Sequence, residues 1–169
     1  ACPDAEDYGI KERFSNKTAI APTASISIIC GGTSPGVEPI AANSFTHKTL
    51  SGSFNVRNRY LEKVLEKHNK NDDETWSTIT TNQGSVYHLD FLTQQEKDVF
   101  KTAFELDQKW IVELGADRTP HISQAQSINI FVPADIHKKE LHQIHFQAWK
   151  KGLKSLYYCR SKSIQRAEN

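Results

Sequence analysis

Tyr157 and Tyr158 stand side by side in the last part of this 169-residue sequence. Adjacent aromatic residues usually pack against a core. The phenol of tyrosine can also be oxidised by one electron and can then oxidise a neighbouring ring. The residues alone leave both interpretations open, packing or a path for electrons. An electron path requires the two rings to lie within about 4.5–7 Å, whereas successive side chains of a regular strand point to opposite faces.

The stretch APTASIS is the second candidate for chemistry. Pro22 ends a short apolar run, and the small residues Thr23, Ala24, Ser25 and Ile26 predict the start of a short helix. Free backbone N–H groups at a helix start, beside hydroxyls, can bind a phosphate. The alternative is that Thr23 or Ser25 only caps the helix. No GxxxxGK[ST] pattern is present, which excludes a P-loop NTPase.

Histidines and cysteines form no recognisable site. His142 and His145 could share a helix face, but no carboxylate or cysteine completes a ligand set, so no metal site is predicted. Cys2, Cys30 and Cys159 are few and widely spaced, which fits a reducing compartment, and we expect a cytoplasmic protein. Cys30 follows an apolar run and is predicted to be buried.

Overall charge and hydropathy give no support for two classes of partner, nucleic acids and membranes. The sequence has 21 basic and 20 acidic residues, a net charge of +1, so nothing indicates a nucleic-acid or membrane-surface protein. Apolar runs such as ISIIC are too short to span a bilayer. Basic residues do gather near the end of the sequence among Trp149, Tyr157 and Tyr158, and we interpret them as a solvated rim: Lys150, Lys151, Lys154, Arg160, Lys162 and Arg166.

The first half of the sequence predicts short elements within one piece. Residues 1–16 are polar and read as an irregular lead-in, and KTAIA is a short strand. FTHKTLSGSFNV predicts a hairpin turning at Ser51–Gly52. NRYLEKVLEKHN predicts a helix with Tyr60, Leu61, Val64 and Leu65 on one face, and NKNDDE a solvated turn.

The second half indicates the fold class. Thr93 and Glu96 form a capping box, and apolar residues at helical spacing predict a long helix that Gly115 ends. QSINIFV is a predicted strand with Ile128, Ile130 and Val132 on one face. A helix capped by Asp135 and ended by Gly152 follows, and LKSLYYC is the next strand. Strand, helix and strand form a parallel βαβ unit, so the class is α/β.

Taken together, several stretches resemble the large, catalytic subunit of class I ribonucleotide reductase. They occur in the family's order over nearly the whole sequence: AIAPTASISIICGGTSPGVEP, THKTLSGSF, QSINIF and WKKGLKSLYYCRSKSIQRA. The resemblance implies a ten-stranded α/β barrel, of which residues 1–169 would form a single piece of the C-terminal part, incomplete on its own.

The resemblance also implies roles for the two candidate sites. Thr23, Ala24, Ser25 and Ile26 would bind the diphosphate of a ribonucleoside diphosphate substrate. Tyr157 and Tyr158 would carry a radical towards the active-site cysteine, with Tyr158 nearer the small subunit. None of the three cysteines has the sequence context of the family's active-site cysteines, so we expect the chain to be inactive alone.

The implied partners follow from what the chain lacks. They are the N-terminal portion of the large subunit, the small radical-generating subunit with its dinuclear metal–tyrosyl centre, and thioredoxin or glutaredoxin as reductant. This chain itself would bind no cofactor, and allosteric nucleotides would bind elsewhere in the large subunit. A split-gene product and a fragment both fit. The alternatives are a non-catalytic phosphate- or nucleotide-binding α/β module and a structural or nucleic-acid-binding domain that uses the basic tail.

Overall fold

The computed structural model describes residues 3–14, 16–31, 34–50 and 52–162, which fold as two compact units. The first unit is Ala1–Glu38 with Asp107–Asn169, and the second is Pro39–Leu106. Each unit has its own hydrophobic core. Within the described ranges, no helix is long and apolar enough to cross a membrane. The expectation of a single barrel piece over residues 1–169 stays a prediction.

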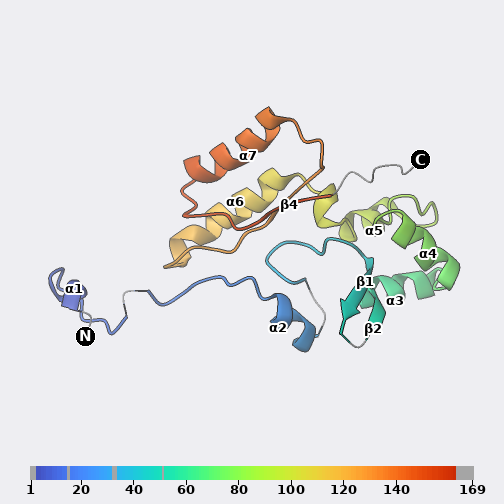
Figure 1. Ribbon diagram of the computed structural model, residues 1–169, viewed down its shortest axis with the longest axis horizontal. Coiled ribbons are helices and arrows are strands. Elements are labelled where there is room, and N and C mark those ends of the chain that lie inside the picture. Colours follow the sequence, from blue (N-terminus) through green and yellow to red (C-terminus); the bar gives the residue numbers. More distant parts are fainter. Residues whose placement is uncertain (1–2, 15, 32–33, 51, 163–169) are drawn as a thin grey trace. The chain divides into compact units, whose positions relative to one another are not determined.

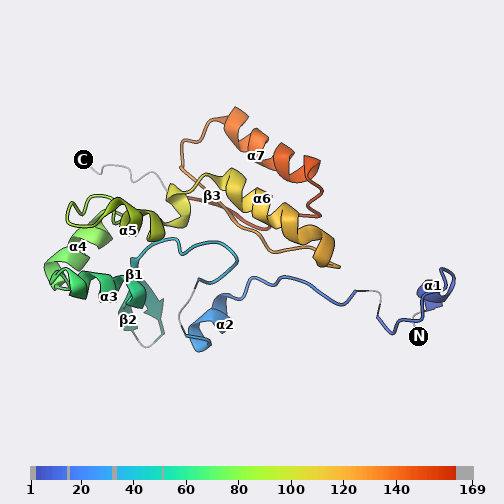
Figure 2. The same cartoon turned by 180° about the vertical axis from the view of Figure 1, so that it is seen from behind.

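The first unit contains the parallel strand pair that the sequence predicts. Strands β3 (Ile130–Val132) and β4 (Cys159–Ser161) pair in parallel, with Ile130 opposite Cys159. Helix α7 (Lys138–Lys150) connects them, which confirms the βαβ unit. Helix α6 (Gln108–Arg118) precedes β3 and lies beside α7 in both views (Figures 1 and 2).

The core of this unit lies where α6 and α7 meet the β3 segment. Ile128, Ile130 and Val132 are almost fully buried, as their shared spacing predicts. Phe131 between them is buried as well, so this strand is covered on both faces, as is usual for parallel sheets. The buried core residues come from all three elements: Ile111, Val112, Ile128, Ile130, Val132, Ile144 and Ala148.

Two boundaries in this unit differ from the predictions. The predicted strand LKSLYYC is wrong in position, because β4 begins only at Cys159. The predicted cap of α7 by Asp135 is also wrong. His137 caps the helix instead, and its Nδ1 accepts a hydrogen bond from the N–H of Lys139 at 3.1 Å. Gly152 follows the helix with φ of 82°, as expected for the residue that ends it.

The amino-terminal segment of the first unit differs from the predictions in two places, the irregular lead-in and the strand KTAIA. The lead-in contains the short helix α1 (Pro3–Glu6). The run KTAIA forms no continuous strand and makes one isolated parallel bridge, between Ile20 and Gln126. Pro22 has no N–H to extend this ladder. Helix α2 (Ala24–Ile29) then forms where the small residues predict it.

The second unit begins with the predicted hairpin. Strands β1 (Ser44–Thr49) and β2 (Gly52–Arg57) pair antiparallel, and Ser51 of the predicted turn lies outside the described residues. Helix α3 (Arg59–Lys67) forms as predicted, with Leu61 and Leu65 fully buried. Three further elements complete the unit: α4 (Asp73–Thr81), α5 (Gln94–Val99) and the 3-10 helix η1 (Ala103–Glu105).

The predicted long helix from Thr93 to Gly115 is wrong. The capping box of Thr93 and Glu96 starts α5 as expected, but α5 ends at Val99. A second capping box, Thr102 with Glu105, then starts η1, and Asp107 caps α6. Each cap holds its own residue in an extended conformation, which interrupts a helix whatever the apolar spacing around it.

Gly115 lies inside α6, which continues to Arg118. A Cβ atom at this position would lie 2.6 Å from Cδ1 of Ile128 and 3.3 Å from Cδ2 of Leu153. Glycine at this position lets the helix backbone pack closely on the β3 segment, and an added Cβ would require the buried side chain of Ile128 to shift. Gly115 does not mark the end of the helix.

Candidate functional site

The tyrosine pair lies immediately before β4. The N–H of Tyr157 donates to the carbonyl of Ile128 at 2.8 Å, and the N–H of Ile130 donates to the carbonyl of Tyr158 at 2.9 Å. These bonds hold the main chain of both tyrosines against the β3 segment. The pair therefore sits at the end of the strand, where the strict alternation of side chains is not imposed.

The two rings are in contact. Their centroids lie 4.1 Å apart, closer than the expected range, and their planes are tilted by 56°, so the rings are not stacked. The hydroxyl of Tyr157 lies 3.5 Å from that of Tyr158, a long hydrogen bond. Both side chains are about half exposed, 47% for Tyr157 and 53% for Tyr158. The geometry allows an exchange of one electron and one proton between the phenols.

The surroundings of Tyr157 favour its neutral phenol. The hydrogen bond with Tyr158 raises the pKa of Tyr157 above its usual value, and the guanidinium of Arg160 opposes this shift only weakly. Arg160 lies over the ring of Tyr158, 5.3 Å from the ring centroid. At neutral pH a phenol of this kind keeps its proton, so its oxidation also requires a proton acceptor.

The start of α2 differs from an ordinary capped helix. Thr23 is left-handed, with φ of 56°, and its side chain does not cap the helix. Its hydroxyl instead donates to the carbonyl of Pro35 at 3.2 Å. Thr23 therefore occupies the N-cap position, but the alternative that its side chain caps the helix is wrong. The first N–H groups of a helix have no partner within it, and Ala24, Ser25 and Ile26 are exposed at this end.

The histidines of α7 have other contacts. His137 caps the helix, the ring of His142 stacks on Phe146, and Nδ1 of His145 contacts the carbonyl of Leu141 at 2.8 Å. In the part of the chain that the structure describes, no group of three or more His, Cys, Asp or Glu residues could hold a metal ion.

The two described cysteines are exposed. Cys30 follows α2 and Cys159 begins β4. The prediction that Cys30 is buried is wrong, because the isoleucines of α2 that precede it are themselves exposed. Cys2 lies outside the described residues.

Two of the basic residues near the end of the sequence contact other parts of the first unit. Lys151 forms an ion pair of 2.6 Å with Glu113 on α6. Nζ of Lys154 donates to the carbonyl of Ile122 at 3.0 Å and to that of Ser123. Arg166 lies outside the described residues. Lys150, Lys151, Lys154 and Arg160 are exposed, as expected for a solvated rim.

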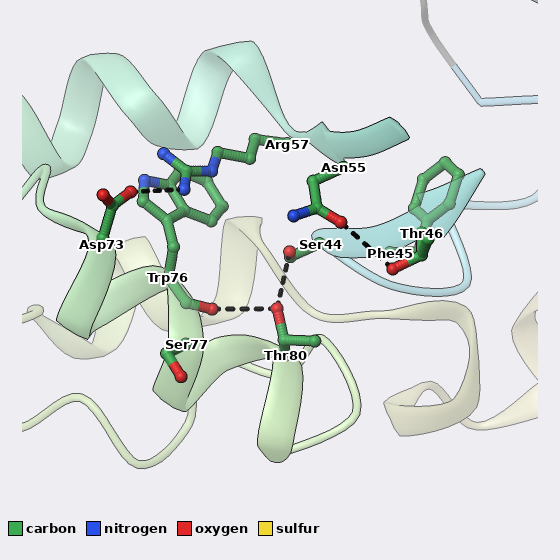
Figure 3. A pocket seen from close by; sticks show the side chains of 9 residues that line it. All are labelled: Ser44, Phe45, Thr46, Asn55, Arg57, Asp73, Trp76, Ser77 and Thr80. Atoms are coloured by element: carbon green, nitrogen blue, oxygen red, sulfur yellow. Dashed lines mark hydrogen bonds and ion pairs between the residues drawn. The ribbon is translucent and has the colours of Figure 1, made fainter. Parts of the chain in front are cut away.

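The second unit contains a pocket of about 430 Å³ beside its hairpin (Figure 3). Arg57 points towards Asp73, with which it forms an ion pair of 2.7 Å, and lies 5.2 Å from the centroid of the Trp76 ring. The hydroxyls of Ser44 and Thr80 are hydrogen-bonded to each other at 2.8 Å. The charges and several hydroxyls that line this pocket are thus already paired within the chain.

The sequence alone did not reveal a buried polar pair. Glu38 and Asn129 are 4% and 8% exposed. Oε1 of Glu38 accepts the backbone N–H of Asn129, and Oε2 accepts from Nδ2 at 3.3 Å. Glu38 stands in a loop rich in proline and glycine, and its partner is 91 residues away. The only signal in the sequence was the polar Asn129 inside the apolar run INIFV.

The likeness to known proteins covers both candidate sites. Residues 4–159 match the family described as "Ribonucleotide reductase, barrel domain". This chain belongs to that family. The match extends over both units, and it confirms the fold class expected from the sequence, part of an α/β barrel of the reductase large-subunit type.

Individual reductase subunits show the same likeness. The ribonucleoside-diphosphate reductase large subunit of Invertebrate iridescent virus 6 is 53% identical over 169 residues, which cover 98% of this chain and 17% of the viral protein. The alpha subunit of Chlamydia pneumoniae is 36% identical over 163 residues, 96% of this chain and 15% of that subunit. The chain thus spans about a sixth of the length of these relatives.

A solved structure of the same family is similar as well. The Actinobacillus ureae class Id ribonucleotide reductase alpha subunit aligns with a TM-score of 0.76 and 41% sequence identity. The alignment covers 85% of this chain and 26% of the alpha subunit. The chain is thus similar to about a quarter of that alpha subunit.

Proposed function

We propose that this chain supplies the C-terminal part of the barrel of a ribonucleoside-diphosphate reductase large subunit. In this role it carries the tyrosine pair of the radical path and the helix start that binds the substrate diphosphate. The observation that carries the proposal is the contact between Tyr157 and Tyr158, whose ring centroids are 4.1 Å apart. Membership of the reductase barrel family supports the same role.

The radical step follows from the order of the two phenols. When the small subunit takes one electron and the hydroxyl proton from Tyr158, this residue becomes a neutral phenoxyl. Tyr157 then gives Tyr158 one electron and its hydroxyl proton, across the 3.5 Å between their oxygens. Tyr158 is restored as a phenol and Tyr157 becomes the phenoxyl. Tyr157 in turn takes one electron and one proton from a cysteine thiol, which becomes a thiyl radical.

The diphosphate would bind at the start of α2. Backbone N–H groups from Thr23 to Ile26 would donate to its oxygens, and the positive end of the short helix adds a favourable charge. Small side chains at Ala24 and Ser25 leave room for a phosphate to reach the backbone. The left-handed conformation of Thr23 leaves its hydroxyl bonded to Pro35 instead of capping the helix.

The remaining parts of the reaction belong to other segments and chains. The reacting cysteine and the reducing cysteine pair would come from the N-terminal portion of the large subunit. The small subunit would supply the radical from its dinuclear metal–tyrosyl centre. Thioredoxin or glutaredoxin would return the two electrons that each turnover consumes. Alone, the chain would be inactive.

The direct test replaces each tyrosine by phenylalanine in the complete large subunit, assembled with its small subunit. Phenylalanine keeps the ring but has no hydroxyl from which a phenoxyl could form. Tyr157→Phe and Tyr158→Phe should each abolish turnover while substrate binding and the melting temperature stay nearly unchanged. Tyr87→Phe, at an exposed tyrosine of the second unit, is the matched control and should keep full turnover.

The opposite pattern would contradict the radical path. If Tyr157 and Tyr158 served only for packing, activity would follow stability in both variants. Turnover near the wild-type rate in either variant would show that the radical does not pass through that residue.

A further inference from the structure

A carboxylate without a cation is buried in the first unit. Glu38 is 4% exposed, and both of its oxygens accept hydrogen bonds from Asn129. Among the described residues, no lysine, arginine or histidine forms an ion pair with it. Burying a charge in this way is unfavourable for stability unless its hydrogen bonds are well made, and an apolar residue would be easier to accommodate. Stability alone therefore does not explain this pair, and we look for its role in the geometry of the residues around it.

The loop around Glu38 is shaped to fit the carboxylate. A Cβ at Gly36 would collide with Oε2 of Glu38, so any other residue there would push the carboxylate out of its present position. The hydroxyl of Ser34 donates to the carbonyl of Glu38. The loop is also tied to the start of α2, because Thr23 donates to the carbonyl of Pro35 at 3.2 Å.

Asn129 lies between the two residues that hold the tyrosine pair. Ile128 accepts from the N–H of Tyr157, and Ile130 donates to the carbonyl of Tyr158. A shift of the main chain at Asn129 would therefore move both anchors of the pair. The contacts thus lead from the start of α2, through the loop and Glu38, to the β3 segment that holds Tyr157 and Tyr158.

We propose that Glu38 is a positioning residue, which fixes the tyrosine pair relative to the start of α2 by binding the backbone and the side-chain amide of Asn129. This inference rests on the proposed function for its relevance to catalysis. Its structural part, that Glu38 and Asn129 set the geometry of the tyrosine pair, stands independently and can be measured without turnover.

The test exchanges the hydrogen-bonding groups of the pair. Asn129→Asp places a carboxylate against the carboxylate of Glu38 and removes the donating Nδ2. The double variant Glu38→Gln/Asn129→Asp restores one donor and one acceptor at this contact, while the remaining oxygen of residue 38 still accepts the backbone N–H. Glu38→Gln alone should be mild, because the amide of Asn129 can turn over and accept with Oδ1, an atom that has no partner in the described structure.

Two readouts are made in the complete large subunit assembled with its small subunit. The first is kcat and KM for a ribonucleoside diphosphate. The second is the ionisation of 3-fluorotyrosine incorporated at position 157, followed by 19F NMR. Contact with Tyr158 raises the pKa of Tyr157, so a loosened pair should ionise at a lower pH than the wild-type pair.

We expect Asn129→Asp to lower kcat by about tenfold or more, as for the loss of a positioning contact, and to lower the pH of ionisation at position 157. The double variant should recover both readouts towards the wild type. Asn71→Asp, at an exposed asparagine whose oxygen accepts from Trp76, is the matched control and should change neither.

Asn129→Ala covers the case in which Asn129→Asp does not assemble. It keeps the backbone bond to Glu38 and removes only the Nδ2 bond, so both readouts should change in the same direction by less. An unchanged fluorotyrosine titration in either Asn129 variant, or a double variant no better than Asn129→Asp, would overturn the proposal. Active phenylalanine variants at positions 157 and 158 would instead refute the radical path and leave the titration result valid.

Discussion

The phenol oxygens of Tyr157 and Tyr158 lie 3.5 Å apart, although the residues are adjacent in sequence. Adjacent residues of a regular strand point to opposite faces of the sheet. The pair avoids this because β4 begins one residue later, at Cys159. The main chain is nevertheless held by hydrogen bonds to Ile128 and Ile130, so the contact between the rings does not depend on an unsupported loop.

The hydroxyl contact has a measurable effect on ionisation. The hydrogen bond with Tyr158 is the largest cause that raises the pKa of Tyr157. In Tyr158→Phe this bond is lost, so Tyr157 should ionise at a lower pH than in the wild type. A titration of 3-fluorotyrosine at position 157 by 19F NMR would show the shift. An unchanged titration would mean that the two hydroxyls are not in contact in solution.

Substitutions at the start of α2 should show whether backbone N–H groups or side-chain hydroxyls contribute more to diphosphate binding. Ser25→Ala removes one hydroxyl and should weaken nucleoside diphosphate binding by about 1 kcal/mol. Ala24→Asp places a negative charge beside the phosphate and should weaken binding far more. Equilibrium binding to the assembled large subunit gives both values. Equal affinity in Ala24→Asp and the wild type would place the diphosphate elsewhere.

Thr23→Pro is not an informative variant at this site. Proline requires φ near −65°, whereas Thr23 has φ of 56°. The substitution would distort the start of α2 whether or not a phosphate binds there, so a loss of affinity would have two explanations.

Gly115→Ala should destabilise the first unit despite the better helix propensity of alanine. The gain in propensity is about 1 kcal/mol, and overpacking against a filled core costs about 1–3 kcal/mol. Ile128→Val removes the Cδ1 atom that would lie 2.6 Å from the Cβ of an alanine at position 115. In a double-mutant cycle measured by urea unfolding, Gly115→Ala should therefore lower the free energy of unfolding by less in the Ile128→Val background than in the wild type. Strict additivity of the two costs would argue against the close packing.

The second unit should lose stability in acid through Glu96. Hydrogen bonds from His68 and from Thr93 lower the pKa of Glu96 from 4.5 to about 2. A depressed pKa means that the ionised group stabilises the folded state above pH 4.5, and that this contribution is lost as the pH falls towards 2. Glu96→Gln should therefore show a shallower loss of stability across this range, measured as the urea midpoint against pH. If the urea midpoint fell equally with pH in the variant and the wild type, Glu96 would not be the cause of the acid sensitivity.

The sequence predicted correctly those elements that are determined by residues close together in the chain. The helix from Arg59 to Lys67, the hairpin and the capping box of Thr93 depend on residues a few positions apart. The parallel pairing of β3 and β4 was also predictable, because it follows from the order strand, helix, strand. The resemblance to the reductase family then supplied the barrel, which no local pattern contains.

The failures have equally specific causes. Apolar spacing from Val99 to Leu114 suggested one helix, but the caps at Thr102 and Asp107 divide it. Helix α4 was missed because its sequence, DETWSTITT, is rich in threonine and only Trp76, Ile79 and Thr75 are buried. The contact between Glu38 and Asn129 joins residues far apart in the chain, and the polar Asn129 in an apolar run does not indicate which residue it contacts.

The close approach of Gly115 to Ile128 also constrains how these positions can change during evolution. A substitution that adds a Cβ at position 115 is acceptable only if the side chain at position 128 vacates the space of its Cδ1 atom. The two positions should therefore covary among members of the family. Relatives with alanine in place of Gly115 should carry, in place of Ile128, a side chain that is shorter or branches differently.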